Sequence, residues 1–193
     1  MSHVIQLLKS MSLTLGVLLV LGPLSMQPAG AQEKLVPSWF KIDADGKSVD
    51  IHFDAAWNTN NGPFNFNGYT KGEATVVIPA DWKAYVTFRT LDADLPHSAL
   101  IGKPGPTGEI PQNAGERDAA IGRAYTDKPK EGMVNAEDTF KILPKPENIG
   151  EYILLCGVNG HAPAGMWIKW VVSADAKTPY LRVDAKPEKP ARP

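Results

Sequence analysis

Apolar and polar side chains alternate in two stretches of the chain, and this period of two predicts half-buried β-strands. The first stretch covers residues 49–54 and the second covers residues 84–89. Further short runs are rich in β-branched and aromatic residues and end at Gly, Pro, Asn or Asp. These runs cover residues 74–78, 139–143, 151–155, 167–173 and 180–183. Seven or eight such strands predict an all-β fold, a Greek-key β-sandwich or barrel.

Two long segments depart from the strand pattern. Residues 102–133 are rich in Gly, Pro and charged side chains, and only residues 113–125 could form a helix there. We interpret this segment as a long loop insertion that decorates one edge of the fold, with a partner-facing flap near a functional site as the alternative. Residues 186–193 alternate Pro with charged residues, a composition that predicts a disordered tail.

The N-terminus has the pattern of an export signal. Lys9 precedes an apolar stretch over residues 12–24, and Ala29-Gly30-Ala31 supplies a small-x-small cleavage site. Residues 1–31 are therefore predicted to be a signal peptide for the general export route, which leaves residues 32–185 as the folded domain. The protein is then periplasmic or otherwise extracytoplasmic. An uncleaved anchor is the alternative, and only in that case do we expect a membrane association.

The charge balance limits the class of partner. The chain has 20 basic and 21 acidic residues, and removal of Lys9 with the signal changes the net charge from −1 to −2. A protein this close to neutral has no electrostatic surface suited to nucleic acid. We therefore expect recognition through apolar contacts, by a single domain with room for a substantial core.

The only cysteine, Cys156, cannot form an internal disulfide. In an oxidising compartment a lone thiol is either buried, paired with another chain, or bound to a metal. Burial is the simpler interpretation, because a predicted strand leads directly into Cys156. However, His161 and Met166 follow at intervals of five residues. A thiolate, an imidazole and a thioether are ligands that suit copper, which favours the metal.

A copper site of this kind needs a second imidazole, and the chain has only four histidines. His3 leaves with the signal, and His52 lies between two aspartates in a strand and is interpreted as a solvated position. His97 follows Pro96 in a loop after the strand at 84–89. The predicted ligand set is therefore His97, Cys156, His161 and Met166, with two imidazoles and a thiolate around one type-1 copper and methionine as a long axial ligand.

The loop from Cys156 to Trp167, the upstream Pro-His, and the sequence Phe-Asn-Phe-Asn-Gly at residues 64–68 resemble the sulfocyanin branch of the cupredoxins, the small blue copper proteins. The resemblance covers most of residues 48–173. It implies a Greek-key β-sandwich with copper at one end and a function in one-electron transfer. Tyr69-Thr70 departs from the family, in which small hydroxylated residues are more common at this turn.

A site with four protein ligands leaves no open position for a substrate, which favours an electron carrier over an enzyme. Cys156 would supply the thiolate, and His97 would be the buried nitrogen, with Ser98 supporting it. His161 lies among Gly, Ala and Pro residues, so its ring edge is expected to emerge through an apolar patch where redox partner proteins dock. A periplasmic copper carrier or buffer is the alternative function.

Overall fold

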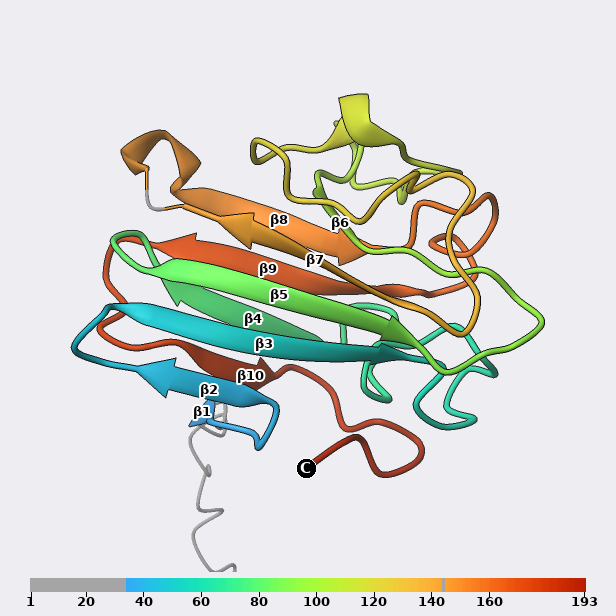
Figure 1. Cartoon of the computed structure of the whole chain (residues 1–193), viewed down its shortest axis with the longest axis horizontal. Coiled ribbons are helices and arrows are strands. Elements are labelled where there is room, and N and C mark those ends of the chain that lie inside the picture. The colour runs from blue at the N-terminus through green and yellow to red at the C-terminus, as the bar shows by residue number, and fades with distance from the viewer. Residues whose placement is uncertain (1–33, 144) are drawn as a thin grey trace, which may run out of the picture. The chain divides into compact units, whose positions relative to one another are not determined.

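Two β-sheets pack against each other in the computed structural model, which describes residues 34–193 apart from residue 144 (Figure 1). The predicted signal peptide or anchor lies outside the described residues. The first sheet has six strands in the order β1-β10-β4-β9-β8-β6. Their bounds are β1 Lys34–Leu35, β10 Tyr180–Val183, β4 Ala74–Pro79, β9 Trp167–Ser173, β8 Gly150–Leu155 and β6 Leu100–Gly102.

The second sheet has four strands in the order β2-β3-β5-β7. Their bounds are β2 Phe40–Asp43, β3 Ser48–Ala55, β5 Lys83–Thr90 and β7 Glu137–Ile142. Strands β3 and β5 run parallel, as do β4 and β9, whereas the other neighbours are antiparallel. The predicted all-β sandwich is therefore confirmed, and its two sheets are mixed.

The core lies between the sheets and follows the alternation of the sequence. In β5 the side chains of Ala84, Val86 and Phe88 are buried, whereas those between them are exposed or half-buried. In β9 the same rule buries Ile168 and Trp170. Strand β4 lies inside the first sheet, between β10 and β9, and is buried at every position. The buried apolar residues of β5 and β9 join one hydrophobic cluster that draws on both sheets, so the pattern of period two reports the core-facing side.

The one helical candidate in the insertion, residues 113–125, does not form an α-helix. The segment contains only the short 3-10 helix η1 at Glu116–Asp118. Its backbone pairs with β6 instead: the Ala120 N–H donates to the Ile101 carbonyl at 2.8 Å, and the Ile101 N–H donates to the Ala124 carbonyl at 2.9 Å. An amide that bonds to a neighbouring strand is not available for the bonds of a helix.

The 102–133 segment also contributes buried residues, so it is not only a loop on the surface. Ala114, Ile121, Ala124 and Thr126 are buried. The Ala114 N–H donates to the carbonyl of Gly157, the residue after the single cysteine, at 3.0 Å. The segment therefore covers the loop that carries Cys156.

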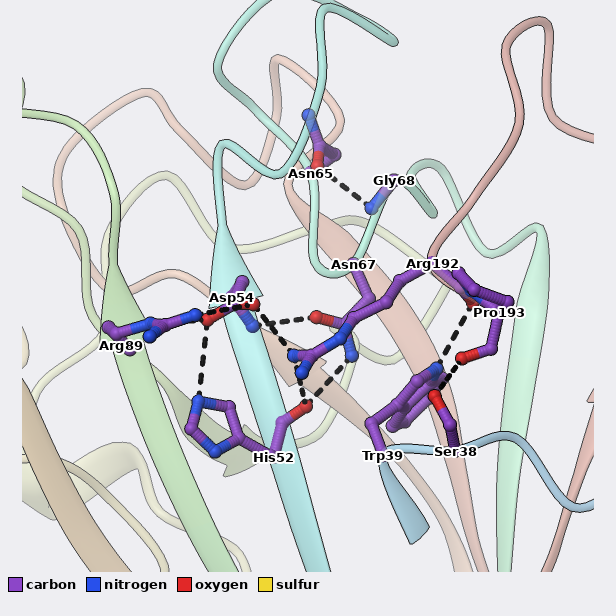
Figure 2. Close-up of polar contacts among 10 residues, drawn as sticks. All are labelled: Ser38, Trp39, His52, Asp54, Asn65, Asn67, Gly68, Arg89, Arg192 and Pro193. Carbon is purple, nitrogen blue, oxygen red and sulfur yellow. Dashed lines mark hydrogen bonds and ion pairs between the residues drawn. The ribbon is translucent and has the colours of Figure 1, made fainter.

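The C-terminal segment 186–193 differs from the prediction of a disordered tail. It packs against the second sheet, and Arg192 is its main contact (Figure 2). The Arg192 guanidinium reaches the carboxylate of Asp54, which is fully buried in β3. The sequence does not reveal this contact because the two residues lie 138 positions apart.

Candidate metal centre

Three predicted ligands converge at one end of the sandwich. His97 lies between β5 and β6, Cys156 follows β8 directly, and His161 lies between β8 and β9. One ligand atom from each of the three lies within 4.8 Å of the other two. The Cys156 sulfur is 3.5 Å from Nδ1 of His161, and the rings of His97 and His161 are 5.1 Å apart between centroids. Among the described residues this is the one group of three or more His, Cys, Asp or Glu side chains that could hold a metal ion.

The group is closed to solvent on most sides. His97 and Cys156 are fully buried, and His161 retains only 8% of its exposure. Neither ring nitrogen of His97 has a hydrogen-bond partner. A buried imidazole without partners is costly, and a metal ion would satisfy it. The donor set and this unpartnered imidazole therefore fit a copper ion.

Backbone hydrogen bonds hold His97 in place. Its N–H donates to the Met133 carbonyl at 2.9 Å, and the Met133 N–H donates back to the His97 carbonyl at 2.8 Å. The chain passes close to this pair at Gly132, where a Cβ would lie 2.7 Å from Cγ2 of Val158 and 3.0 Å from the His97 carbonyl oxygen. The Asp92 carboxylate approaches Nε2 of His97 to 3.7 Å, which is beyond hydrogen-bond distance.

The loop from Cys156 to Met166 closes on itself. The Cys156 N–H donates to the Met166 carbonyl at 3.1 Å, and the Met166 N–H donates to the His161 carbonyl at 3.0 Å. Met166 is fully buried beside Cys156 in the main hydrophobic cluster. These bonds fix the backbone of three predicted ligands relative to one another.

Both the backbone N–H and the hydroxyl of Ser98 lie near the Cys156 sulfur, and the N–H is the donor to it. The Ser98 N–H points at the sulfur from 3.4 Å, and the Ser98 hydroxyl lies 3.7 Å away. That hydroxyl also bridges two loops, since it accepts the Gly157 N–H at 2.9 Å and donates to the Pro129 carbonyl at 2.7 Å. Ser98 thus acts where the sequence placed it, beside His97, but its contacts are with the cysteine loop and the 102–133 segment.

Burial also controls the protonation of the site. It lowers the pKa of His97 to about 4, and nearby His161 contributes to the same shift while Asp92 opposes it. Burial likewise lowers the pKa of His161. It raises the pKa of the Cys156 thiol, against the opposing hydrogen bonds from Ser98. The imidazoles are therefore neutral and available as ligands, whereas the thiol needs a cation to lose its proton.

The sequence analysis missed the residues of the 58–71 segment that touch the cysteine loop. Phe64 packs edge-on against the His161 ring at 4.8 Å between centroids. Asn61 Nδ2 donates to the Ala164 carbonyl at 2.9 Å, and the Thr70 hydroxyl donates to the Gly165 carbonyl at 2.6 Å. The Phe-Asn-Phe-Asn-Gly motif was the available signal. Thr70 therefore supports the site, although it departs from the family pattern.

His52 does not belong to the site. It lies in β3, where Nε2 is 3.4 Å from an oxygen of Asp54, and a third of its side chain is exposed. Its exposure agrees with the predicted strand position, but Asp54 next to it is buried and not solvated. No helix within the described part of the chain is both long and apolar enough to cross a membrane.

Comparison with known proteins gives consistent matches. The family model described as the sulfocyanin (SoxE) domain matches residues 37–183. The sulfocyanin of Sulfolobus acidocaldarius is 28% identical over 144 residues, which are 73% of this chain and 71% of that protein. The rusticyanin of Acidithiobacillus ferrooxidans is 31% identical over 132 residues, 68% of this chain and 80% of that protein. A solved rusticyanin variant superposes with a TM-score of 0.50 at 25% identity, covering 70% of this chain and 86% of that one.

Proposed function

The chain belongs to the sulfocyanin family of blue copper cupredoxins, and we propose that it is an exported electron carrier that transfers single electrons between redox partners. Cupredoxins bind one type-1 copper, and such an ion supplies a one-electron couple. The observation that supports the proposal is the closed group of two imidazoles and one thiol within 4.8 Å. This donor set is typical of a blue-copper site.

In this proposal His97, Cys156, His161 and Met166 hold the copper. Burial keeps the free Cys156 thiol protonated, so this residue would bind copper as the thiolate and release its proton to solvent. His97 binds as the buried neutral imidazole. Met166 supplies a weak thioether from the core side of the loop.

The chain around these ligands excludes water and limits movement. The 102–133 segment covers Gly157, and Ser98 holds the segment to the cysteine loop. The 58–71 segment fixes the carbonyls of Ala164 and Gly165 on the other side. A carrier benefits from this arrangement because a ligand set that does not rearrange suits both oxidation states.

Partner proteins are proposed to dock around His161, which at 8% is the most exposed of the proposed ligands. Pro163 and Ala164 beside it are exposed, and Phe64 against its ring is half-buried. An apolar patch with one imidazole edge lets a redox partner approach closely without strong charge steering. The near-neutral chain argues for this mode of docking and against nucleic acid as a partner.

The copper-loaded protein tests the proposal. The oxidised form should be intensely blue or blue-green, bleach on uptake of one electron per copper, and recover its colour on reoxidation. Cys156→Ser should lose the colour, because the thiolate is the source of the strong visible absorption. A colourless oxidised copper protein would rule out a type-1 site.

A copper carrier or buffer is the second candidate because the ligands are soft. Carriers exchange metal through exposed ligands, whereas His97 and Cys156 are fully buried. Rapid loss of copper to a competing chelator, without reversible colour cycling, would favour the carrier. Export is tested separately, by mass spectrometry of the native protein: a mature chain that begins at Gln32 supports the signal peptide, and an intact N-terminus supports the anchor.

A further inference from the structure

A buried carboxylate lies at the end of strand β3. Asp54 is fully buried, and Arg89 from the neighbouring strand β5 binds both of its oxygens at 2.8 and 3.0 Å (Figure 2). The two residues are direct partners in the register of β3 and β5. This pair is complete within the second sheet, because a bidentate guanidinium already satisfies a buried carboxylate.

A second guanidinium reaches the same carboxylate from the C-terminal segment. Arg192 donates to an Asp54 oxygen at 2.7 Å, and its charged group lies over the ring of Trp57, 5.2 Å from the centroid. Its backbone is bonded too, since the Arg192 N–H donates to the Asn67 carbonyl at 2.8 Å and the Trp39 indole donates to the Arg192 carbonyl at 3.2 Å. Arg192 thus joins the end of the chain to β3 and to the turn that contains Asn67.

Other contacts fasten the C-terminal segment to the same turn. Asn58 Nδ2 donates to the Pro190 carbonyl at 2.7 Å, and Lys189 contacts the hydroxyl of Thr59. Ala191 packs so closely on Gly68 that a Cβ at Gly68 would lie 2.9 Å from the Cα of Ala191. Residues 189–192 therefore hold both ends of the 58–68 stretch, at Asn58-Thr59 and at Asn67-Gly68.

Asn67 fixes this turn to β3. Its Oδ1 accepts the Asp54 N–H at 2.7 Å, and its Nδ2 donates to the His52 carbonyl at 2.9 Å (Figure 2). Asn67 has a φ of 52°, a left-handed conformation that asparagine tolerates better than most side chains. The turn consequently depends on the end of β3 and on Arg192 for its position.

The other side of the same segment holds the proposed copper loop. Asn61, Thr70 and Lys71 donate to the carbonyls of Ala164 and Gly165, and Phe64 packs on the ring of His161. The 58–71 segment therefore lies between two structures: the C-terminal segment on one side and the loop with His161 and Met166 on the other.

We propose that residues 186–193 are a strap that positions the proposed copper loop through the 58–71 segment, and that Arg192 is its positioning residue. The inference rests on the proposed ligand set for its effect on copper, but the strap itself is a property of the polypeptide. With the strap in place, Phe64 stays against His161 and the loop carbonyls keep their donors. Without it, the 58–71 segment loses its outer support and the two loops move more freely.

The role of Arg192 can be tested by a substitution that leaves the rest of the buried charge cluster in place. Substitution of Arg89 would leave the buried Asp54 without its sheet partner and would disturb the whole fold. Substitution of Arg192 leaves the bidentate Asp54–Arg89 pair intact. Lys186 provides a matched control, because it carries the same charge in the same segment and is exposed.

Hydrogen exchange should be measured on Arg192→Ala, Arg192→Lys and Lys186→Ala, each with and without copper. In Arg192→Ala, amides of residues 58–71 and 160–166 should exchange about tenfold faster, the factor expected for loss of one hydrogen bond to a charged group. Arg192→Lys should restore part of the protection, and Lys186→Ala should behave as the wild type. Strands β5 and β9 should keep their protection in all three variants.

The copper-loaded variants give a second measurement. The reduction potential and the electron paramagnetic resonance spectrum of Arg192→Ala should shift from those of the wild type, whereas those of Lys186→Ala should not. Faster exchange confined to residues 186–193 would overturn the proposal, and so would an equal rise in all strands, which would mean only a global loss of stability. If Arg192→Ala does not fold, Arg192→Gln keeps one donor and allows the same comparison.

The two proposals fail in different ways. A protein that binds no copper would contradict the proposed function but leave the exchange result on the metal-free chain valid. A blue protein whose 58–71 segment is indifferent to Arg192 would contradict only the strap.

Discussion

The backbone N–H of Ser98 points at the sulfur of Cys156 from 3.4 Å, although the two residues are 58 positions apart. The hydrogen bond brings the loop after β5 to the end of β8, so that His97 and the cysteine lie at one site. It also places a donor where negative charge develops on the thiolate. Hydrogen bonds to a ligating sulfur tune the potential of a blue-copper site.

Ser98→Ala should destabilise the protein while the colour is retained. The substitution keeps the backbone donor to the sulfur but removes the hydroxyl that joins the Gly157 N–H to the Pro129 carbonyl. Buried groups left without a partner cost about 1–3 kcal/mol. Urea unfolding of the metal-free and copper-loaded forms measures the loss. An unchanged free energy of unfolding in both forms would show that the hydrogen bonds of the Ser98 hydroxyl do not stabilise the protein.

Met166→Leu should retain copper and change its reduction potential. Leucine conserves the volume in this fully buried position, so the cost in stability should stay below about 1.5 kcal/mol. The thioether that Met166 would offer to copper is, however, removed. A potentiometric titration checks the shift, with Met133→Leu as the control, because Met133 is joined to His97 by backbone hydrogen bonds that the substitution keeps. An identical potential in Met166→Leu would remove Met166 from the ligand set.

The metal-free protein should lose stability as the pH falls from about 6.5 to about 4. Burial holds the pKa of His97 at about 4 in the folded chain, below the ordinary value of 6.5, and lowers that of His161 as well. The unfolded chain therefore binds more protons in this window, and acid favours unfolding. Melting temperatures across the window check the sign.

Copper should protect against this acid effect. Protons compete for His97 only near its folded pKa of about 4, so the blue absorbance should persist at about pH 5. His52→Gln serves as the control, because His52 lies in β3 outside the site. Bleaching that begins at about pH 6.5 would mean that His97 titrates as a free imidazole.

Gly165→Ala should destabilise the cysteine loop. Gly165 has a φ of 117°, and a Cβ there would lie 2.7 Å from Nδ2 of Asn61 and 2.8 Å from Cγ of Lys71. The strain alone costs about 1–3 kcal/mol, and the clash should disturb the bonds that Gly165 accepts from Thr70 and Lys71. Thermal melting and the rate of copper release to a chelator measure both effects.

Gly62→Ala is the matched control for Gly165→Ala. Gly62 also has a positive φ, 65°, but a Cβ there would meet no atom within 4 Å beyond its chain neighbours. It therefore reports the cost of a positive φ without the clash, and this cost is smaller than at Gly165 because 65° lies in the left-handed region that side chains can adopt. Equal copper release from the two variants would contradict a specific role for the close approach at Gly165.

The local pattern of the sequence determined the long strands and most of the candidate site. Alternation in β3 and β5 and the apolar run of β8 depend on which face of a strand is buried, and this information is contained in adjacent residues. The intervals from Cys156 to His161 and Met166 are equally local, because all three lie on one loop. The short strands β1, β2 and β6 were not predicted, since two to four residues carry little pattern, and among strands this short only β10 was predicted.

Only the tertiary structure decided which residues far apart in the sequence form hydrogen bonds and ion pairs with one another. Asp54 looked like a solvated strand residue, but Arg89 and Arg192 neutralise it, and Arg192 is 138 positions away. The 113–125 region forms no α-helix because the Ala120 N–H and the Ala124 carbonyl bond to Ile101 of β6. A charged side chain can be buried, and a backbone amide can form hydrogen bonds outside a helix, when a residue elsewhere in the chain supplies the hydrogen-bond partner. The pattern of adjacent residues does not contain that partner.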